Sequence, residues 1–201
     1  MLQQSANDSR SPARGTQDRL RFRHPKREDG QAVHDLIASC EALDGNSLYC
    51  NFLQCTHFSE TCMLAEENGK ILGWVSAYIP PKDPGTLFVW QVAVDEAARG
   101  RKLARRLIAK LLDSEGCEDI ERIKTTITPD NRSSWRMFEG LADQFGAEVS
   151  DTVWLCEKKH FAGQHDSEHM LTIAPIGSSE DEARPAETMG QRMNQAEAAA
   201  A

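Results

Sequence analysis

Hydrophobic positions recur at helical spacing in three segments of the chain. Val33, Leu36, Ile37 and Cys40 follow the i, i+3, i+4, i+7 pattern of an amphipathic helix within residues 27–43. Residues 103–112 repeat the pattern, and Gly116 is expected to end that helix. Residues 133–147 predict a third helix with inward-facing residues Trp135, Phe138 and Leu141. The stripe on the second helix consists of Leu103, Ala104, Leu107, Ile108, Leu111 and Leu112.

The segments between these helices have the composition of strands. Residues 61–81 predict two strands joined by a turn at Asn68-Gly69, a dipeptide typical of hairpins. Residues 86–94 are apolar on both faces, which is typical of a central strand. Further strands are expected at 20–25, 120–129, 151–158 and 169–176. This order predicts an α/β fold in which helices cover both faces of a mixed sheet.

Charge and composition limit the domain organisation and the partners. Residues 1–19 and 178–201 are polar and predict disordered tails, which leaves one domain at residues 20–177. A formal net charge of −8 argues against nucleic-acid or membrane-surface partners. The first residues lack the apolar core of a secretory signal, so a cytoplasmic protein is expected. The six cysteines lack metal-ligand spacing, so reduced thiols and no metal are expected.

A basic loop follows the strand at residues 86–94 and opens the helix at 103–112. The first amides of a helix favour anions, but neither a Walker loop nor a dinucleotide-binding glycine pattern is present. The loop resembles motif A of the GNAT acetyltransferase superfamily. The resemblance implies a mostly antiparallel sheet, a loop whose amides hold the pyrophosphate of acetyl-CoA, and a strand that pairs with its pantetheine arm. The matching positions are Val92, Ala93, Val94, Arg99, Gly100, Arg101, Lys102, Leu103 and Ala104.

A later segment, residues 126–147, also resembles this superfamily. Asn131 and Ser134 match positions that meet CoA. Two residues depart from the pattern. Lys102 stands where the family usually has glycine, and Phe138 stands where many relatives have a tyrosine that protonates the leaving thiolate. A phenyl ring cannot donate a proton, so water or another group fills that role, or none is needed.

Residues 43–94 resemble the L-2,4-diaminobutyrate acetyltransferases of ectoine biosynthesis. The shared strings are "LDGNSLY", "HF", "PPKDP" and "LFVWQVAV", followed later by "TPDN" and "HDSE". The resemblance covers about residues 20–177 and implies a homodimer that acetylates the 4-amino group of this diamino acid. Its pocket needs acceptors for two ammonium groups and a donor for one carboxylate. The candidate substrate-binding residues are Asp44, Asn46, Ser47, Tyr49, Trp90 and Glu168.

The 4-ammonium group must lose a proton before it attacks, which requires a base. Asp44 or Glu168 is the candidate catalytic base, and Tyr49 is a third candidate. Each residue also has a structural explanation: a turn at Asp44, a helix cap at Asn46 or Ser47, core aromatics at Tyr49 and Trp90, and a solvated carboxylate at Glu168. His57 is as compatible with a structural role as with a binding one. A GNAT enzyme for another amine and a non-catalytic acetyl-CoA-binding regulator stay open as alternatives.

Overall fold

The computed structural model describes residues 20–40, 43 and 45–177. The chain divides into two compact units, of which the first contains residues up to Pro80 and Phe88–Glu118. The second contains Pro81–Leu87 and the residues from Asp119 onward. The predicted tails and Asp44 lie outside the described residues. The single domain at 20–177 stays a prediction.

The first unit is built on four antiparallel strands, each paired with the next along the chain. The turn between the second and third strands has Asn68 at φ 53° and Gly69 at φ 73°, which confirms the predicted hairpin. Both residues adopt the positive φ that a two-residue hairpin turn of this kind requires. The strands are β1 (Arg21–Arg23), β2 (Cys62–Glu67), β3 (Lys70–Tyr78) and β4 (Thr86–Val94).

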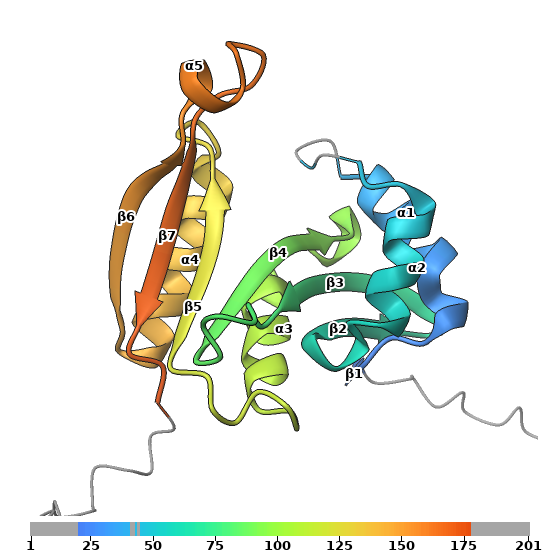
Figure 1. Cartoon of the computed structure of the whole chain (residues 1–201). Coiled ribbons are helices and arrows are strands. Elements are labelled where there is room, and N and C mark those ends of the chain that lie inside the picture. The colour runs from blue at the N-terminus through green and yellow to red at the C-terminus, as the bar shows by residue number, and fades with distance from the viewer. Residues whose placement is uncertain (1–19, 41–42, 44, 178–201) are drawn as a thin grey trace, which may run out of the picture. The chain divides into compact units, whose positions relative to one another are not determined.

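Helices cover both faces of this four-stranded sheet (Figure 1). Trp74 on β3 is fully buried in a cluster with Val33, Leu36 and Ile37 of helix α1. Its neighbour Gly73 points the other way, toward leucines of helix α3. The helices of this unit are α1 (Gly30–Ala38), α2 (Leu48–Thr56) and α3 (Leu103–Leu112), with 3-10 turns η1 (Arg27–Asp29), η2 (Ser59–Thr61) and η3 (Glu96–Ala98).

Two features of these helices differ from the expectations. Helix α2 was not predicted, although the Ser47 side chain caps it by accepting a 3.1 Å hydrogen bond from the Cys50 amide. Helix α3 ends at Leu112 with Asp113 as its C-cap, so Gly116, at φ 91°, belongs to the following turn and does not end the helix. The predicted apolar stripe of α3 is otherwise confirmed, since its leucines and Ile108 are buried except for half-buried Leu112.

The second unit places three antiparallel strands in the order β5, β7, β6. Helix α4 packs against these strands, with Phe138, Leu141 and Ala142 buried. Trp135 was predicted to face the core, and this prediction is wrong. The side chain is only half-buried and lines a surface groove. The elements are β5 (Arg122–Ile127), α4 (Arg132–Phe145), β6 (Glu148–Leu155), α5 (Glu157–His160) and β7 (Glu168–Ala174).

Candidate active site

The loop between β4 and α3 has the backbone geometry of an open helix N-terminus. After η3 the chain passes through Gly100 at φ 78° and Lys102 at φ 56°, and α3 begins at Leu103. The amides of the first helical turn have no partner within their own helix, and the helix dipole adds partial positive charge at this end. The loop predicted to hold a pyrophosphate therefore ends in a turn that can receive an anion.

The basic side chains of this loop have different surroundings. The Arg101 guanidinium binds both carboxylate oxygens of Glu67, at 2.8 and 3.2 Å. Arg99 lies 3.8 Å from Glu96, and both side chains are largely exposed. The Lys102 ammonium is exposed and has no hydrogen bond or ion pair with any residue that the structure describes. Leu103 is buried and Ala104 half-buried, so only their backbone amides are suited to a ligand.

Lys102 adopts the left-handed conformation that glycine adopts at low cost. We expect Lys102→Gly to raise the free energy of unfolding by up to about 1 kcal/mol, because relief of strain of about 1–2 kcal/mol exceeds the entropic cost of glycine, about 0.4–1 kcal/mol. Urea denaturation measures this change. As a control, Arg99→Gly removes a residue with φ −59° and should destabilise the protein. A lower stability for Lys102→Gly would contradict the strain argument. If the backbone alone holds the pyrophosphate, acetyl-CoA affinity is retained, whereas a large loss of affinity would assign the Lys102 ammonium to the site.

The strand that leads into the loop is anchored on both faces. Ala93 is buried opposite Trp74, while Val92 and Val94 are half-buried opposite Val75 and Gly73.

A β-bulge interrupts the pairing of β4 with β3 just before these residues. Ser76 pairs with Gln91 and Ala77 with Val89, so Trp90 is the extra residue. Trp90 is 48% exposed. The alternative that Trp90 is a core aromatic is therefore wrong, and its side chain is accessible to a substrate.

The predicted acceptor residues of the first unit lie before and within α2. The Asn46 amide nitrogen donates to Gln91 Oε1 at 2.9 Å, which ties this segment to β4. Ser47 is the N-cap of α2, as its structural explanation required. Tyr49 is 72% exposed, so its ring is free to contact a ligand. Gln91 had no recognisable signal in the sequence, and its link to Asn46 is a long-range contact.

The remaining predicted residues belong to the second unit. Asn131 is the N-cap of α4, and its side chain accepts a 3.1 Å hydrogen bond from the Ser134 amide. Glu168 begins β7 and is half-buried, with its Oε1 atom 3.9 Å from Nε2 of His165. The ring of His165 lies against Phe161, with 4.7 Å between ring centroids. His165 belongs to the "HDSE" string but is not among the predicted site residues.

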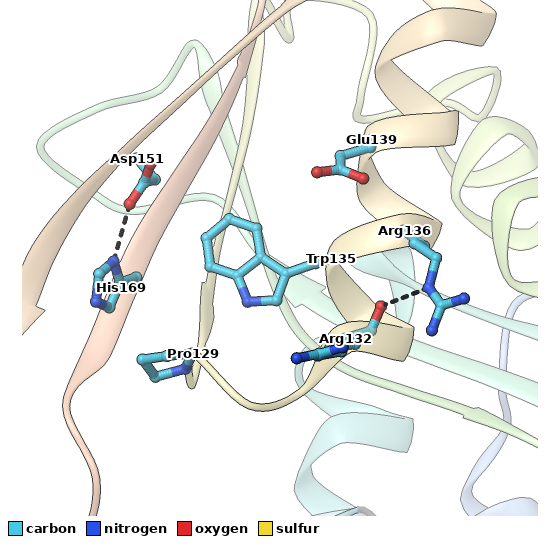
Figure 2. Close-up of a pocket in the computed structure, with 7 residues that line it drawn as sticks. All are labelled: Pro129, Arg132, Trp135, Arg136, Glu139, Asp151 and His169. Atoms are coloured by element: carbon cyan, nitrogen blue, oxygen red, sulfur yellow. Dashed lines mark hydrogen bonds and ion pairs between the residues drawn. The ribbon is translucent and has the colours of Figure 1, made fainter.

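A groove of about 510 Å³ lies in the second unit, between the first turns of α4 and strands β6 and β7 (Figure 2). His169 Nδ1 lies 2.8 Å from an Asp151 oxygen, and the Trp135 indole donates to the Thr128 carbonyl at 3.0 Å. None of the predicted site residues lines this groove, which is formed by Pro129, Arg132, Trp135, Arg136, Glu139, Asp151 and His169.

The cysteine thiols of the described chain differ in their surroundings. Burial raises the pKa of Cys55 and of Cys62 to about 12, so both are protonated at neutral pH. Hydrogen bonds from the Lys159 and Lys158 amides lower the pKa of Cys156, which lies outside the predicted site. Among the described residues no group of His, Cys, Asp and Glu side chains is arranged to hold a metal ion. None of the described helices has the length and apolar character needed to cross a membrane.

The model of the acetyltransferase (GNAT) family matches residues 31–142. L-2,4-diaminobutyric acid acetyltransferases from Vibrio cholerae and Methylotuvimicrobium alcaliphilum are each 47% identical to this chain. The matches cover 79% and 76% of this chain, and 91% and 88% of those relatives. The chain belongs to the diaminobutyrate acetyltransferases. A diaminobutyrate acetyltransferase from Paenibacillus lautus has been solved in complex with L-2,4-diaminobutyric acid and coenzyme A. It is 35% identical to this chain and superposes with a TM-score of 0.75. The match covers 80% of this chain and 98% of the Paenibacillus lautus chain.

Membership in the diaminobutyrate acetyltransferases confirms the fold class predicted from the sequence, a GNAT-type, mostly antiparallel sheet with helices on both faces. Strand β4 and the loop into α3 lie within the span matched by the GNAT family, as do Asn131 and Ser134. Glu168 lies beyond that span. The individual roles of the site residues stay predictions.

Proposed function

We propose that this chain transfers the acetyl group of acetyl-CoA to the 4-amino group of L-2,4-diaminobutyrate, in ectoine biosynthesis. The products are N4-acetyl-L-2,4-diaminobutyrate and CoA. The observation that carries the proposal is the likeness to the Paenibacillus lautus enzyme, which holds this diamino acid and coenzyme A. The named relatives, 47% identical over most of their length, support the same substrate.

Acetyl-CoA fits the loop between β4 and α3. Its pyrophosphate carries negative charge, and the loop offers the first amides of a ten-residue helix together with the cations Arg99 and Lys102. Strand β4 offers the backbone of Val92, Ala93 and Val94 to the pantetheine arm. In the second unit, Asn131 and Ser134 at the start of α4 are proposed to contact CoA.

The acceptor site must hold a flexible molecule with two ammonium groups and one carboxylate. We assign the ammonium groups to carboxylates, with Asp44 and Glu168 as the candidates, and assign Asn46, Ser47 and Tyr49 to polar contacts. Trp90, exposed at the bulge, is proposed to form one wall of this pocket. Asp44 lies outside the described residues.

The reaction forms one bond and breaks another. A carboxylate, Glu168 or Asp44, accepts the proton of the 4-ammonium group, with Tyr49 as the third candidate. The neutral amine then bonds to the thioester carbonyl carbon, and backbone amides near Val92 or Ala93 stabilise the developing negative charge on the oxygen. The carbon–sulfur bond breaks, and CoA leaves as the thiolate.

The leaving thiolate does not receive its proton from Phe138. This phenyl ring is 4% exposed in the core of the second unit and has no acidic proton. A CoA thiolate is a fair leaving group, so protonation by water is sufficient.

An amine panel tests the substrate. With acetyl-CoA, we expect kcat/KM for L-2,4-diaminobutyrate to exceed that for L-ornithine, one methylene longer, by about 10-fold or more. L-Lysine and a linear polyamine should react more slowly still. Thiol release measures the rates, and mass spectrometry with proton NMR identifies the acetylated nitrogen. If another amine is turned over faster, that amine is the substrate and the assignment to diaminobutyrate is wrong. If the protein binds CoA but turns over no amine, it is a regulator.

We propose that the chain functions as a cytoplasmic homodimer. The apolar strand β7 is not available for an interface through its edges, because it lies between β5 and β6, and its Leu171 and Ile173 are buried. Strand β6 ends the order in the second unit and exposes Val149, Val153 and Trp154. An exposed strand edge with apolar side chains favours association with a second copy. Gel filtration with light scattering distinguishes a monomer from a dimer.

A further inference from the structure

The pyrophosphate loop is held by charged residues of the β2–β3 hairpin, far away in the sequence. Glu67, the last residue of β2, pairs with Arg101, and Lys70, the first residue of β3, pairs with Asp95 at 2.6 Å. The Asp95 amide also donates to the Leu72 carbonyl of β3 at 2.9 Å. Three contacts from one hairpin therefore fix both ends of the loop segment 95–101.

Arg101 is the best held of the loop cations. Two nitrogens of its guanidinium donate to the two carboxylate oxygens of Glu67. This bidentate geometry fixes the orientation of the guanidinium as well as its distance from Glu67. Hydrogen bonding from Arg101 lowers the pKa of Glu67, so the carboxylate is ionised at neutral pH. The Arg101 side chain is 37% exposed and that of Glu67 29%. Both partners of the pair are therefore charged at neutral pH.

Asp95 serves the loop in a second way. One of its oxygens binds Lys70, and the other accepts a 3.0 Å hydrogen bond from the Ala97 amide, so Asp95 caps the start of η3. Hydrogen bonding from Lys70 lowers the pKa of Asp95, so this contact is also ionic at neutral pH. The hairpin thereby sets where the chain leaves β4 as well as where it enters α3.

We propose that Glu67 is a positioning residue for acetyl-CoA. Through Arg101 it holds the loop so that the first amides of α3 face the pyrophosphate, while Lys102 and Arg99 supply the attraction. This inference rests on the proposed function, because it assigns the loop to the pyrophosphate of acetyl-CoA. Arg101, which was predicted to bind the cofactor, would then act by holding the loop in place through Glu67.

Because Glu67 is charged, the proposal can be tested by whether its replacement strengthens or weakens CoA binding. Glu67→Gln removes a negative charge near the proposed diphosphate site, so Coulomb attraction alone would tighten CoA binding. Loss of the paired, oriented Arg101 would instead weaken it. We expect the Kd for CoA, measured by calorimetry, to rise about two- to fivefold, the range for an exposed ion pair. The KM for acetyl-CoA should rise in parallel, with kcat and the KM for diaminobutyrate unchanged.

Glu96→Gln is the matched control. Like Glu67→Gln it removes one negative charge, but from the loop itself. The Glu96 side chain is 89% exposed, and the replacement loses only a 3.8 Å contact to Arg99. We expect CoA binding to be unchanged or slightly tighter in this variant.

A double-mutant cycle adds a second readout. If Arg101 acts through Glu67, Arg101→Met should add little to the effect of Glu67→Gln. If Glu67 and Arg101 act independently of each other, the two losses add. Additive losses, or a Glu67→Gln protein that binds CoA as tightly as the wild type, would overturn the proposal. A wild-type protein that does not bind CoA would overturn the proposed function itself, so the two failures are distinct.

Discussion

Glu168→Gln is expected to lower kcat for diaminobutyrate by about 100-fold or more, the usual contribution of a general base. Gln keeps the size of the side chain but cannot accept the ammonium proton. CoA affinity should not change, because Glu168 begins β7 and is not part of the loop between β4 and α3. Steady-state kinetics across pH, with calorimetry of CoA, separates the two effects. Raising the pH should partly restore the rate, since more substrate amine is then neutral.

Glu148→Gln is the control for this variant. Glu148 is an exposed residue at the far end of the same strand pair, opposite Ala174, so its replacement should leave kcat unchanged. A Glu168→Gln protein with near wild-type kcat would rule out Glu168 as the base and leave Asp44 and Tyr49 as the candidates. If only the KM for diaminobutyrate rose, Glu168 would be a substrate-binding residue without a role in proton transfer.

The largest expected loss of stability comes from truncating Leu107 on α3. This side chain is fully buried and points at Gly73 of β3. Leu107→Ala should lower the free energy of unfolding by about 2–5 kcal/mol, through lost burial and the cavity left behind. Leu112→Ala, at a half-buried position on the same helix, should cost less. Chemical denaturation measures both changes.

Gly73 offers a direct test of this packing. A Cβ atom at Gly73 would lie 2.8 Å from Cδ1 of Leu107 and 3.0 Å from Cδ2 of Leu103. Gly73→Ala alone should therefore be neutral or destabilising, because the new methyl group crowds these leucines. In the Leu107→Ala background the same methyl group enters the cavity and should recover part of the loss. Equal effects of Gly73→Ala in both backgrounds would contradict this packing.

Local sequence patterns predicted the elements whose signals are local. The Asn68-Gly69 turn requires two positive φ angles, which that dipeptide adopts easily, and the stripe on residues 103–112 matches one helix face. Helix α2 was missed although it is as long as α1, because two of its buried residues, Asn51 and Gln54, are polar and give no apolar stripe. Its Ser47 cap was interpreted chiefly as a pocket residue. The four-residue helix α5 is too short to show periodicity.

The candidate site was predictable only where its residues form a local motif. Arg99 to Ala104 could be found because the loop and the helix start are contiguous in sequence. The contacts of Glu67 with Arg101 and of Asn46 with Gln91 join residues 34 and 45 positions apart. Such pairs depend on how the strands and helices are packed, which periodicity does not reveal.

The bulge at Trp90 also determines how the chain tolerates a change in length. In a regular strand, losing one residue turns every later side chain to the opposite face. In β4 this would bring Val92 and Val94 toward α1 and Ala93 toward α3. Position 90 is different, because Trp90 has no partner on β3. If residue 90 is deleted, Val89 stays opposite Ala77 and Gln91 stays opposite Ser76. Strand β4 therefore keeps its pairing with β3 when it loses the residue that is proposed to face the substrate.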